Sequence, residues 1–245
     1  MSKPELVLLH GVGLDRTMWQ PVIGALETEF TVRTLNLLGH GSREAAWDGI
    51  TLADLADDIG WQLSPATHLV GFSLGALVAQ YLARYRPELV ASLTSVSSVC
   101  QRTDAERDLV LTRLATAESD FPASVAASLR RWFPSDSLDV RLNPESASEV
   151  ESILLSNDVP SYLNSYRVFA TADAEIGPEL ARISAPSLAI TGELDSGSTP
   201  EMTRRLAAAI PNCSAVVVSE CRHMLPIERP VEFTAAVTTF LREHS

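Results

Sequence analysis

A serine between two glycines, in the run Gly71-Phe72-Ser73-Leu74-Gly75, is the stretch of this sequence that most suggests chemistry. An apolar segment precedes it and an apolar helical run follows it, which predicts a strand, a sharp turn and a helix. Glycines are expected at these two positions for a steric reason. Such a turn brings the strand and the helix so close together that side chains two residues before and after the serine would collide. Ser73 is therefore a candidate nucleophile. A glycine-rich turn without a catalytic role is the alternative interpretation.

A serine hydroxyl needs a neighbouring base, and imidazole has the pKa that suits this task near neutral pH. Among the five histidines, His223 follows the last strand-like run and is the best placed. His68 begins the segment that leads to the serine, so it should lie at the far end of that strand. His10 and His40 precede glycines in loops, where a backbone role is the simpler interpretation. We therefore expect His223 to be the general base.

A carboxylate is needed to orient that imidazole and to stabilise its charged form. Asp195 and Glu193 both follow the apolar run 187–191, which is typical of a buried strand. We prefer Asp195 because it lies further out along the loop, although a solvated loop aspartate remains the alternative interpretation.

Acyl transfer also requires two N–H donors that face the developing oxyanion. The N–H of Leu74, directly after the serine at a helix start, is one candidate. The other is the N–H of Val12, in the loop His10-Gly11-Val12-Gly13, where glycines let the backbone approach a substrate closely. A glycine turn without catalytic purpose is the alternative for this loop.

Apolar strand-like runs alternate with helical patterns along most of the chain. Strands are expected at 6–9, 31–35, from 67 to the serine, 90–96, 187–191 and 214–218. This order predicts an α/β fold with a mostly parallel sheet and helices on both faces. Ligands of such sheets bind beyond the carboxyl ends of the strands, so the His10-Gly11 loop, Ser73, Asp195 and His223 should meet at one rim.

The alternation stops after the strand 90–96, and helical patterns occupy the next part of the chain. We expect a core domain formed by 1–99 and 175–245, with a helical cap, or lid, inserted at 100–174. The expected substrate-binding residues of this cap are Arg130, Arg131, Trp132 and Tyr166. A cap arginine can pair with a substrate carboxylate in a low dielectric, whereas surface arginines and core aromatics are the alternative interpretation.

The composition excludes some classes of partner. A formal net charge of −12 over 245 residues argues against binding to nucleic acid or to an anionic membrane, which require clustered Lys and Arg. Three scattered cysteines suit a reducing compartment and suggest neither a disulfide framework nor a metal site. With no signal-peptide pattern or long apolar run, we expect a cytoplasmic protein with a small-molecule substrate, no metal and no cofactor.

These motifs together resemble the α/β-hydrolase superfamily over essentially the whole chain. The matching segments are His10-Gly11-Val12-Gly13, the Gly39-His40-Gly41 loop through Arg43, Gly71 to Gly75, Gly192 to Asp195, and His223 with Glu228 and Pro230. The order Ser, Asp, His along the chain is that of the α/β-hydrolase triad. Within the superfamily, the chain is similar to the helical-capped branch of 3-oxoadipate enol-lactonases, small carboxylesterases, cofactor-free haloperoxidase-like enzymes and carbon–carbon bond hydrolases.

The resemblance implies a serine hydrolase that cleaves a small carboxylic ester or lactone through an acyl-enzyme. A hydrolase of a carbon–carbon or amide bond in a ring-cleavage catabolic intermediate is the second interpretation. A ligand receptor of the same fold with slow turnover is the third, and perhydrolysis would use the same residues.

The sequence departs from the family pattern in three places. Asn36 stands where an aspartate is usual, and Arg222 stands where a glycine usually precedes the catalytic histidine. Only five residues precede Leu6, so we expect the sheet to lack the usual first hairpin and to leave the 31–35 strand at an edge. We expect a loop or the second subunit of a homodimer to cover that edge.

Overall fold

A single parallel sheet forms the centre of the computed structural model, which describes residues 3–134 and 145–244. Its strands are β1 (Glu5–Leu9), β2 (Thr31–Leu35), β3 (Thr67–Phe72), β4 (Val90–Val96), β5 (Ser187–Gly192) and β6 (Cys213–Val218). They lie in the order β2-β1-β3-β4-β5-β6, and each neighbouring pair is parallel. The predicted α/β class with a mostly parallel sheet is confirmed.

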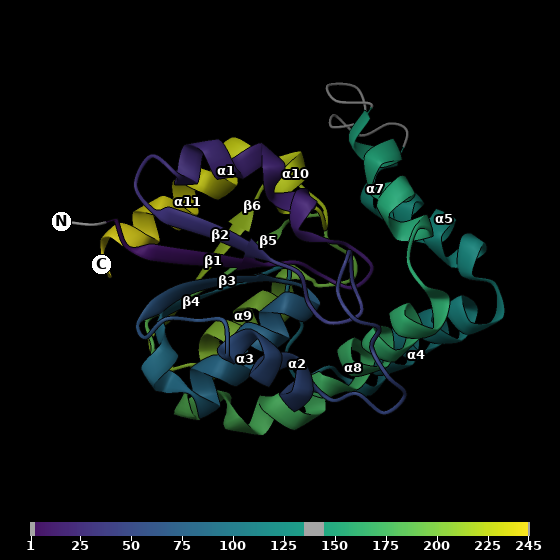
Figure 1. The fold of residues 1–245 in the computed structure, drawn as a ribbon, viewed down its shortest axis with the longest axis horizontal. Helices are drawn as coiled ribbons and strands as arrows, with labels where there is room; N and C mark the ends of the chain where they lie inside the picture. Colours follow the sequence, from purple (N-terminus) through teal and green to yellow (C-terminus); the bar gives the residue numbers. More distant parts are fainter. Residues whose placement is uncertain (1–2, 135–144, 245) are drawn as a thin grey trace.

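Helices cover both faces of this sheet (Figure 1). One face carries α1 (Gln20–Leu26), the short α10 (Leu225–Glu228) and α11 (Pro230–Arg242), and the other carries α2 (Leu52–Gly60), α3 (Leu74–Tyr85) and α9 (Pro200–Ala209). The side chains of β1 alternate between the two layers. Leu6 and Leu8 belong to the core under α1 and α11, while Val7 and Leu9 belong to the core under α2 and α3.

Local sequence explains where these helices begin. The Thr51 hydroxyl accepts a hydrogen bond from the N–H of Asp54, whose carboxylate accepts one from the N–H of Thr51, so a capping box opens α2. A 3-10 turn, Arg16–Trp19, precedes α1. Asp15 caps that turn through the N–H of Thr17.

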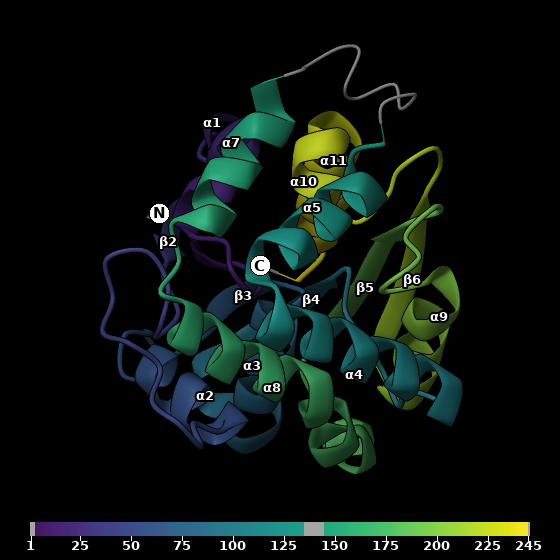
Figure 2. The same ribbon diagram turned by 90° about the vertical axis from the view of Figure 1, so that its right-hand side faces the viewer.

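Within the described residues, four long helices lie between β4 and β5 in the chain. They are α4 (Asp104–Ser119), α5 (Phe121–Trp132), α7 (Glu145–Leu155) and α8 (Val159–Ile176). Figures 1 and 2 show α4, α5 and α7 beyond the carboxyl ends of the strands, while α8 runs back along α3. Helix α8 continues past the expected cap boundary at 174, and a 3-10 turn, Gly177–Arg182, then leads towards β5.

The expected edge strand is confirmed, because β2 lies at one end of the sheet order and pairs only with β1 among the described strands. Its residues are exposed at Thr31 and half-buried at the other positions. Within β2, the Arg33 guanidinium forms an ion pair with Glu5. A homodimer across this edge stays a prediction. Among the helices of the described residues, none is both long and apolar enough to cross a membrane.

Candidate active site

The turn between β3 and α3 holds Ser73 in a strained conformation. Its backbone angles are φ 53° and ψ −111°, in the left-handed half of the map that a side chain normally avoids. The flanking glycines make this turn possible. A Cβ on Gly71 would overlap the carbonyl oxygen of Gly75, and a Cβ on Gly75 would lie 2.5 Å from the carbonyl oxygens of Leu9 and His10. The turn therefore presents Ser73 at the carboxyl end of a central strand.

Asp195 and His223 meet at the same rim, in the loops that follow β5 and β6. The Nδ1 atom of His223 lies 2.7 Å from Oδ2 of Asp195, and both side chains are almost fully buried. The other carboxylate oxygen of Asp195 accepts hydrogen bonds from the backbone N–H groups of Gly197 and Ser198, at 2.8 Å and 2.9 Å. The aspartate is thus fixed by its own loop and in turn fixes the imidazole ring.

Glu193, the other candidate for the carboxylate beside His223, has a different hydrogen-bond partner. Its Oε2 accepts a hydrogen bond from the N–H of Glu220. The structure therefore brings Asp195, and not Glu193, against His223.

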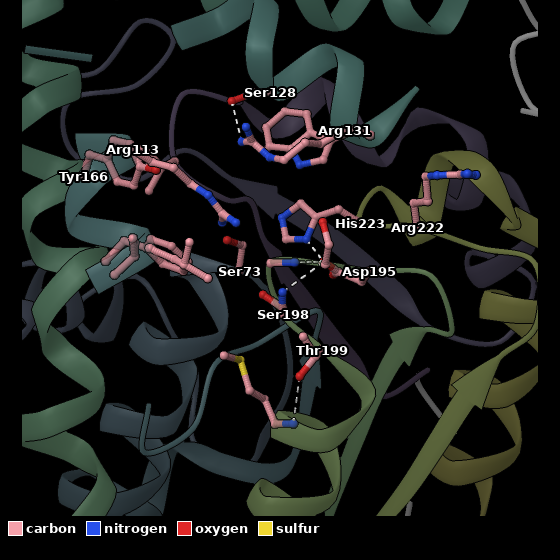
Figure 3. A pocket seen from close by; sticks show the side chains of 18 of the residues that line it. Ser73, Arg113, Ser128, Arg131, Tyr166, Asp195, Ser198, Thr199, Arg222 and His223 are labelled. Atoms are coloured by element: carbon pink, nitrogen blue, oxygen red, sulfur yellow. Dashed lines mark hydrogen bonds and ion pairs between the residues drawn. The ribbon is translucent and has the colours of Figure 1, made fainter. Parts of the chain in front are cut away.

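The loop that carries His223 is fixed by buried groups that the sequence reasoning did not assign. The carboxylate of Glu228 accepts hydrogen bonds from the N–H groups of Arg222 and Met224, at 2.8 Å and 2.7 Å, on either side of the histidine. The Ser97 hydroxyl donates to the carbonyl oxygen of His223. Arg222 replaces the usual glycine without disturbing this arrangement, and its side chain points away from His223 and Ser73 (Figure 3).

Ser73 and His223 line one cavity (Figure 3). In that view the imidazole ring lies between Asp195 and Ser73. The described residues show no hydrogen bond between the Ser73 hydroxyl and His223. The hydrogen bond between a candidate base and a candidate nucleophile is often long or poorly aligned before a substrate binds.

The N–H groups of Val12 and Leu74 lie on the two segments that border Ser73. Val12 lines the cavity, and Leu74 is the first residue of α3, directly after Ser73. Neither N–H donates a hydrogen bond to another group in the described part of the chain. Two donors at a helix start and in a neighbouring loop are the arrangement that stabilises an oxyanion.

The inserted helices supply the roof of the cavity. Arg131, Trp132 and Tyr166 line it, as the sequence predicts. Arg130 is exposed and is not among the lining residues, because successive residues of a helix point in directions about 100° apart. We therefore assign no substrate contact to Arg130.

Further lining residues were not predicted from the sequence. Arg113 on α4 and the aromatic residues Tyr162 and Phe169 on α8 also face the cavity. Arg113 follows Val110 by three residues and precedes Leu114, which are both buried on α4. The helical spacing of these apolar residues is the signal that could have placed Arg113 beside the buried face.

Comparison with known proteins agrees with this geometry. Residues 6–237 match the model of a family described as the alpha/beta hydrolase family. The chain belongs to this family. It is 31% identical to (E)-2-((N-methylformamido)methylene)succinate hydrolase of Acinetobacter baylyi, over 96% of this chain and 89% of that protein.

Two further similar proteins are named as enol-lactonases. The chain is 29% identical to 3-oxoadipate enol-lactonase 1 of Acinetobacter baylyi, over 98% of this chain and 90% of that one. The crystal structure of the enol-lactonase from Burkholderia xenovorans LB400 superposes with a TM-score of 0.89 and 26% identity, over 99% and 92% of the two chains. The protein is therefore an α/β-fold hydrolase, and the resemblance to enol-lactonases is confirmed.

The remaining histidines of this hydrolase lie outside the cavity. His10 and His40 are buried and pack edge to face, with ring centroids 4.9 Å apart. Burial lowers the pKa of His10 to about 3, with a further contribution from His40, and burial lowers the pKa of His40 to about 4. His68 bonds to Ser92 at the other end of the sheet. The two loop histidines, His10 and His40, are thus neutral structural groups.

Asn36 also has a structural contact in this hydrolase, since its Oδ1 accepts a hydrogen bond from the N–H of Arg16 at 2.7 Å. The three cysteines are free thiols. Within residues 3–134 and 145–244, no group of three or more His, Cys, Asp or Glu side chains is arranged to hold a metal ion.

Proposed function

We propose that this hydrolase cleaves a small carboxylic ester or lactone through an acyl-enzyme. The observation that carries the proposal is the 2.7 Å contact between His223 Nδ1 and Asp195 Oδ2, at a cavity that also exposes the strained Ser73. A base held by a carboxylate beside a serine in a tight turn is the arrangement that acyl transfer requires.

In the proposed reaction, the Ser73 hydroxyl oxygen attacks the carbonyl carbon and its proton passes to Nε2 of His223. Asp195 stabilises the imidazolium, and the N–H groups of Val12 and Leu74 hold the negative oxygen of the tetrahedral intermediate. The imidazolium then protonates the leaving alcohol as its bond to carbon breaks. Water, deprotonated by His223, then attacks the acyl-enzyme. The bond between the acyl carbon and the Ser73 oxygen breaks, this oxygen takes the proton back from His223, and the acid is released.

The helices between β4 and β5 act as the cap in this proposal, which assigns 100–174 to substrate selection. Arg131, Trp132 and Tyr166 line the cavity from that segment, so they are among the cap residues that would face a bound substrate. The core, 1–99 with 175–245, supplies the reacting groups.

Hydrolysis of an amide or carbon–carbon bond in a small catabolic acid is the second candidate. The similarity to (E)-2-((N-methylformamido)methylene)succinate hydrolase favours it. A panel of esters, lactones and amide-bearing acids distinguishes the two, because the same serine mechanism would act on all three at different rates.

Hydrolysis of p-nitrophenyl acetate tests the nucleophile. Replacing Ser73 with alanine should lower kcat by at least about a thousandfold, because the attacking oxygen is removed while the fold is retained. Mass spectrometry of the wild-type protein quenched during turnover should find the acetyl group on Ser73. Ser148→Ala is the matched control, since the Ser148 hydroxyl bonds only the backbone of α7.

Unchanged hydrolysis by the Ser73→Ala protein would overturn the assignment of the nucleophile. Slow turnover of every substrate, combined with a large rise in Tm when a ligand is added, would instead favour a receptor of this fold.

A further inference from the structure

Three of the four arginines that line the cavity, Arg113, Arg131 and Arg222, have no acidic partner among the described residues, and Arg222 points away from Ser73 (Figure 3). Arg113 forms no ion pair or hydrogen bond there, and Arg131 donates only to the carbonyl oxygen of Ala127 and to the hydroxyl of Ser128. They come from two different helices, α4 and α5, and Figure 3 shows the guanidinium group of Arg113 pointing towards Ser73. The two side chains are both half-buried.

The two acidic side chains that line the cavity, Glu106 and Asp195, already have other partners. Glu106 lines the cavity but forms an ion pair with Arg205 at 2.7 Å. Asp195 accepts hydrogen bonds from its own loop and holds His223. Arg102, the fourth lining arginine, is neutralised by the buried Asp173 at 2.6 Å. The cavity therefore keeps positive charge in a protein whose net charge is −12.

Unpaired positive charge on Arg113 and Arg131 is energetically unfavourable in these partly buried surroundings. Tyr162, Tyr166 and Phe169 form an apolar wall, and the pKa of Arg131 is lowered first by burial and then by the repulsion of Arg113. Partly buried cations of like sign are stabilised when an anion binds between them, since a carboxylate supplies both the opposite charge and hydrogen-bond acceptors. This arrangement suits the binding of an anionic ligand.

We propose that the substrate carries a free carboxylate in addition to the bond that is cleaved, and that Arg113 and Arg131 bind this carboxylate while Ser73 attacks the carbonyl group. The inference rests on the proposed function and adds the class of substrate. The cavity has a volume of about 150 Å³, close to that of a cavity that holds benzene, so the acid is a short one.

The test compares monomethyl succinate and monomethyl glutarate with methyl levulinate, a neutral ester in which a methyl ketone replaces the carboxylate of the succinate ester. The wild-type protein should favour the acid esters in kcat/KM. Arg113→Met and Arg131→Met should each lower the ratio of acid-ester to neutral-ester kcat/KM by about 10- to 100-fold, as expected for a hydrogen bond to a charged group. Methionine keeps an unbranched, largely apolar side chain and removes the charged guanidinium group.

Arg130→Met is the matched control, because Arg130 neighbours Arg131 on α5 but is not among the lining residues. The Arg130→Met protein should keep the wild-type ratio of acid-ester to neutral-ester kcat/KM. A wild-type protein that cleaves the neutral ester as well as the acid esters, with the same ratio in all three variants, would overturn the carboxylate site and leave the hydrolase function intact.

A wild-type protein that cleaves none of these esters would instead count against the proposed ester hydrolysis. The carboxylate site is then tested by calorimetry with glutarate and the Ser73→Ala protein. Binding that is at least about tenfold weaker when Arg113→Met is added supports the site, and equal binding or no binding overturns it.

Discussion

Trp132, on helix α5, contacts the proposed base His223. Its indole ring stacks on the imidazole of His223, with ring centroids 5.3 Å apart and an angle of 22° between the planes. Phe72 approaches the same imidazole, with ring centroids 5.0 Å apart. The negative face of an indole attracts a cation, so this stack favours the imidazolium of the proposed reaction. Trp132 therefore links the cap to the chemistry of the proposed triad.

Replacing Trp132 with leucine should lower kcat by about 10-fold, because a partly desolvated cation–π contact is worth about 1–2 kcal/mol. Trp132→Phe, which keeps an aromatic face, should lose less. Steady-state kinetics on the preferred ester measure both effects, with Trp61→Leu as a control at an exposed tryptophan. If leucine and phenylalanine variants lose the same activity, the aromatic face has no such role.

At the scale of single residues, the sequence is most informative about side chains that lie at the end of a strand. Ser73, Asp195 and His223 each come directly after a strand or in the loop beyond it, so a parallel sheet brings them together. The orientation of a side chain on a cap helix cannot be deduced in that way. Arg130 and Arg131 are equivalent in the sequence, and only the packing of α5 decides which of them faces the cavity.

At the scale of elements, the junction between α7 and α8 connects the proposed cap to the loop of Val12. The side-chain amide of Asn157 donates a hydrogen bond to the carbonyl oxygen of Gly13 at 2.8 Å. Tyr162 and Leu154 pack so closely on Gly13 that a Cβ there would lie 2.6 Å and 2.8 Å from their side chains. Gly13 has φ +73°, which favours glycine. The cap thus holds the backbone next to a proposed oxyanion donor.

Asn157→Ala should therefore lower kcat by about 10-fold with a smaller change in KM, because a misplaced N–H weakens binding of the transition state more than that of the substrate. Ser156→Ala is the matched control, since its hydroxyl bonds only the backbone of α7. An effect on KM alone, or equal losses in the two variants, would contradict a role in aligning the Val12 loop.

The elements of the core were predictable because strands and caps leave local signals. The strands β2 and β4 match the expected ranges 31–35 and 90–96, and β5 and β6 each extend slightly beyond theirs. Contacts between distant segments leave no such signal. The hydrogen bond from Asn157 to Gly13 and the hydrogen bonds of Glu228 to the His223 loop could not be predicted from the spacing of residues in the sequence. Both depend on how separate elements pack.

At the scale of the whole molecule, two buried neutral histidines connect stability to pH. His10 accepts a hydrogen bond from the N–H of Leu37 at Nε2 and bonds to the carbonyl of Gly11 at Nδ1, so its ring fits only as the neutral form. His40 bonds to the carbonyl of Leu38 through Nδ1, while its Nε2 is buried without a partner in the described chain. A second proton, which would make either ring a buried cation, would disrupt this packing.

The folded-state pKa values of about 3 and about 4 lie below the ordinary value of 6.5, so the unfolded chain binds protons first as the pH falls. Stability from this pair is therefore complete above pH 6.5 and lost below it. Between about pH 7.5 and about pH 5.5 each histidine should remove about 1.4 kcal/mol from the free energy of unfolding. Protonation of the histidines in the unfolded chain thus adds to the acid sensitivity of the whole fold.

Urea unfolding of His40→Asn at those two pH values isolates this contribution from that of the carboxylates. Asparagine keeps a donor for the carbonyl of Leu38 and removes the titrating ring, so the loss of stability between the two pH values should shrink by about 1.4 kcal/mol. Ser161→Ala is the control, because the Ser161 hydroxyl bonds Gly39 and Ala46 of the same loop and carries no titrating group. Its destabilisation should be the same at both pH values. A His40→Asn protein with the pH dependence of the wild type would show that His40 takes up its proton without loss of the fold, contrary to the buried neutral ring.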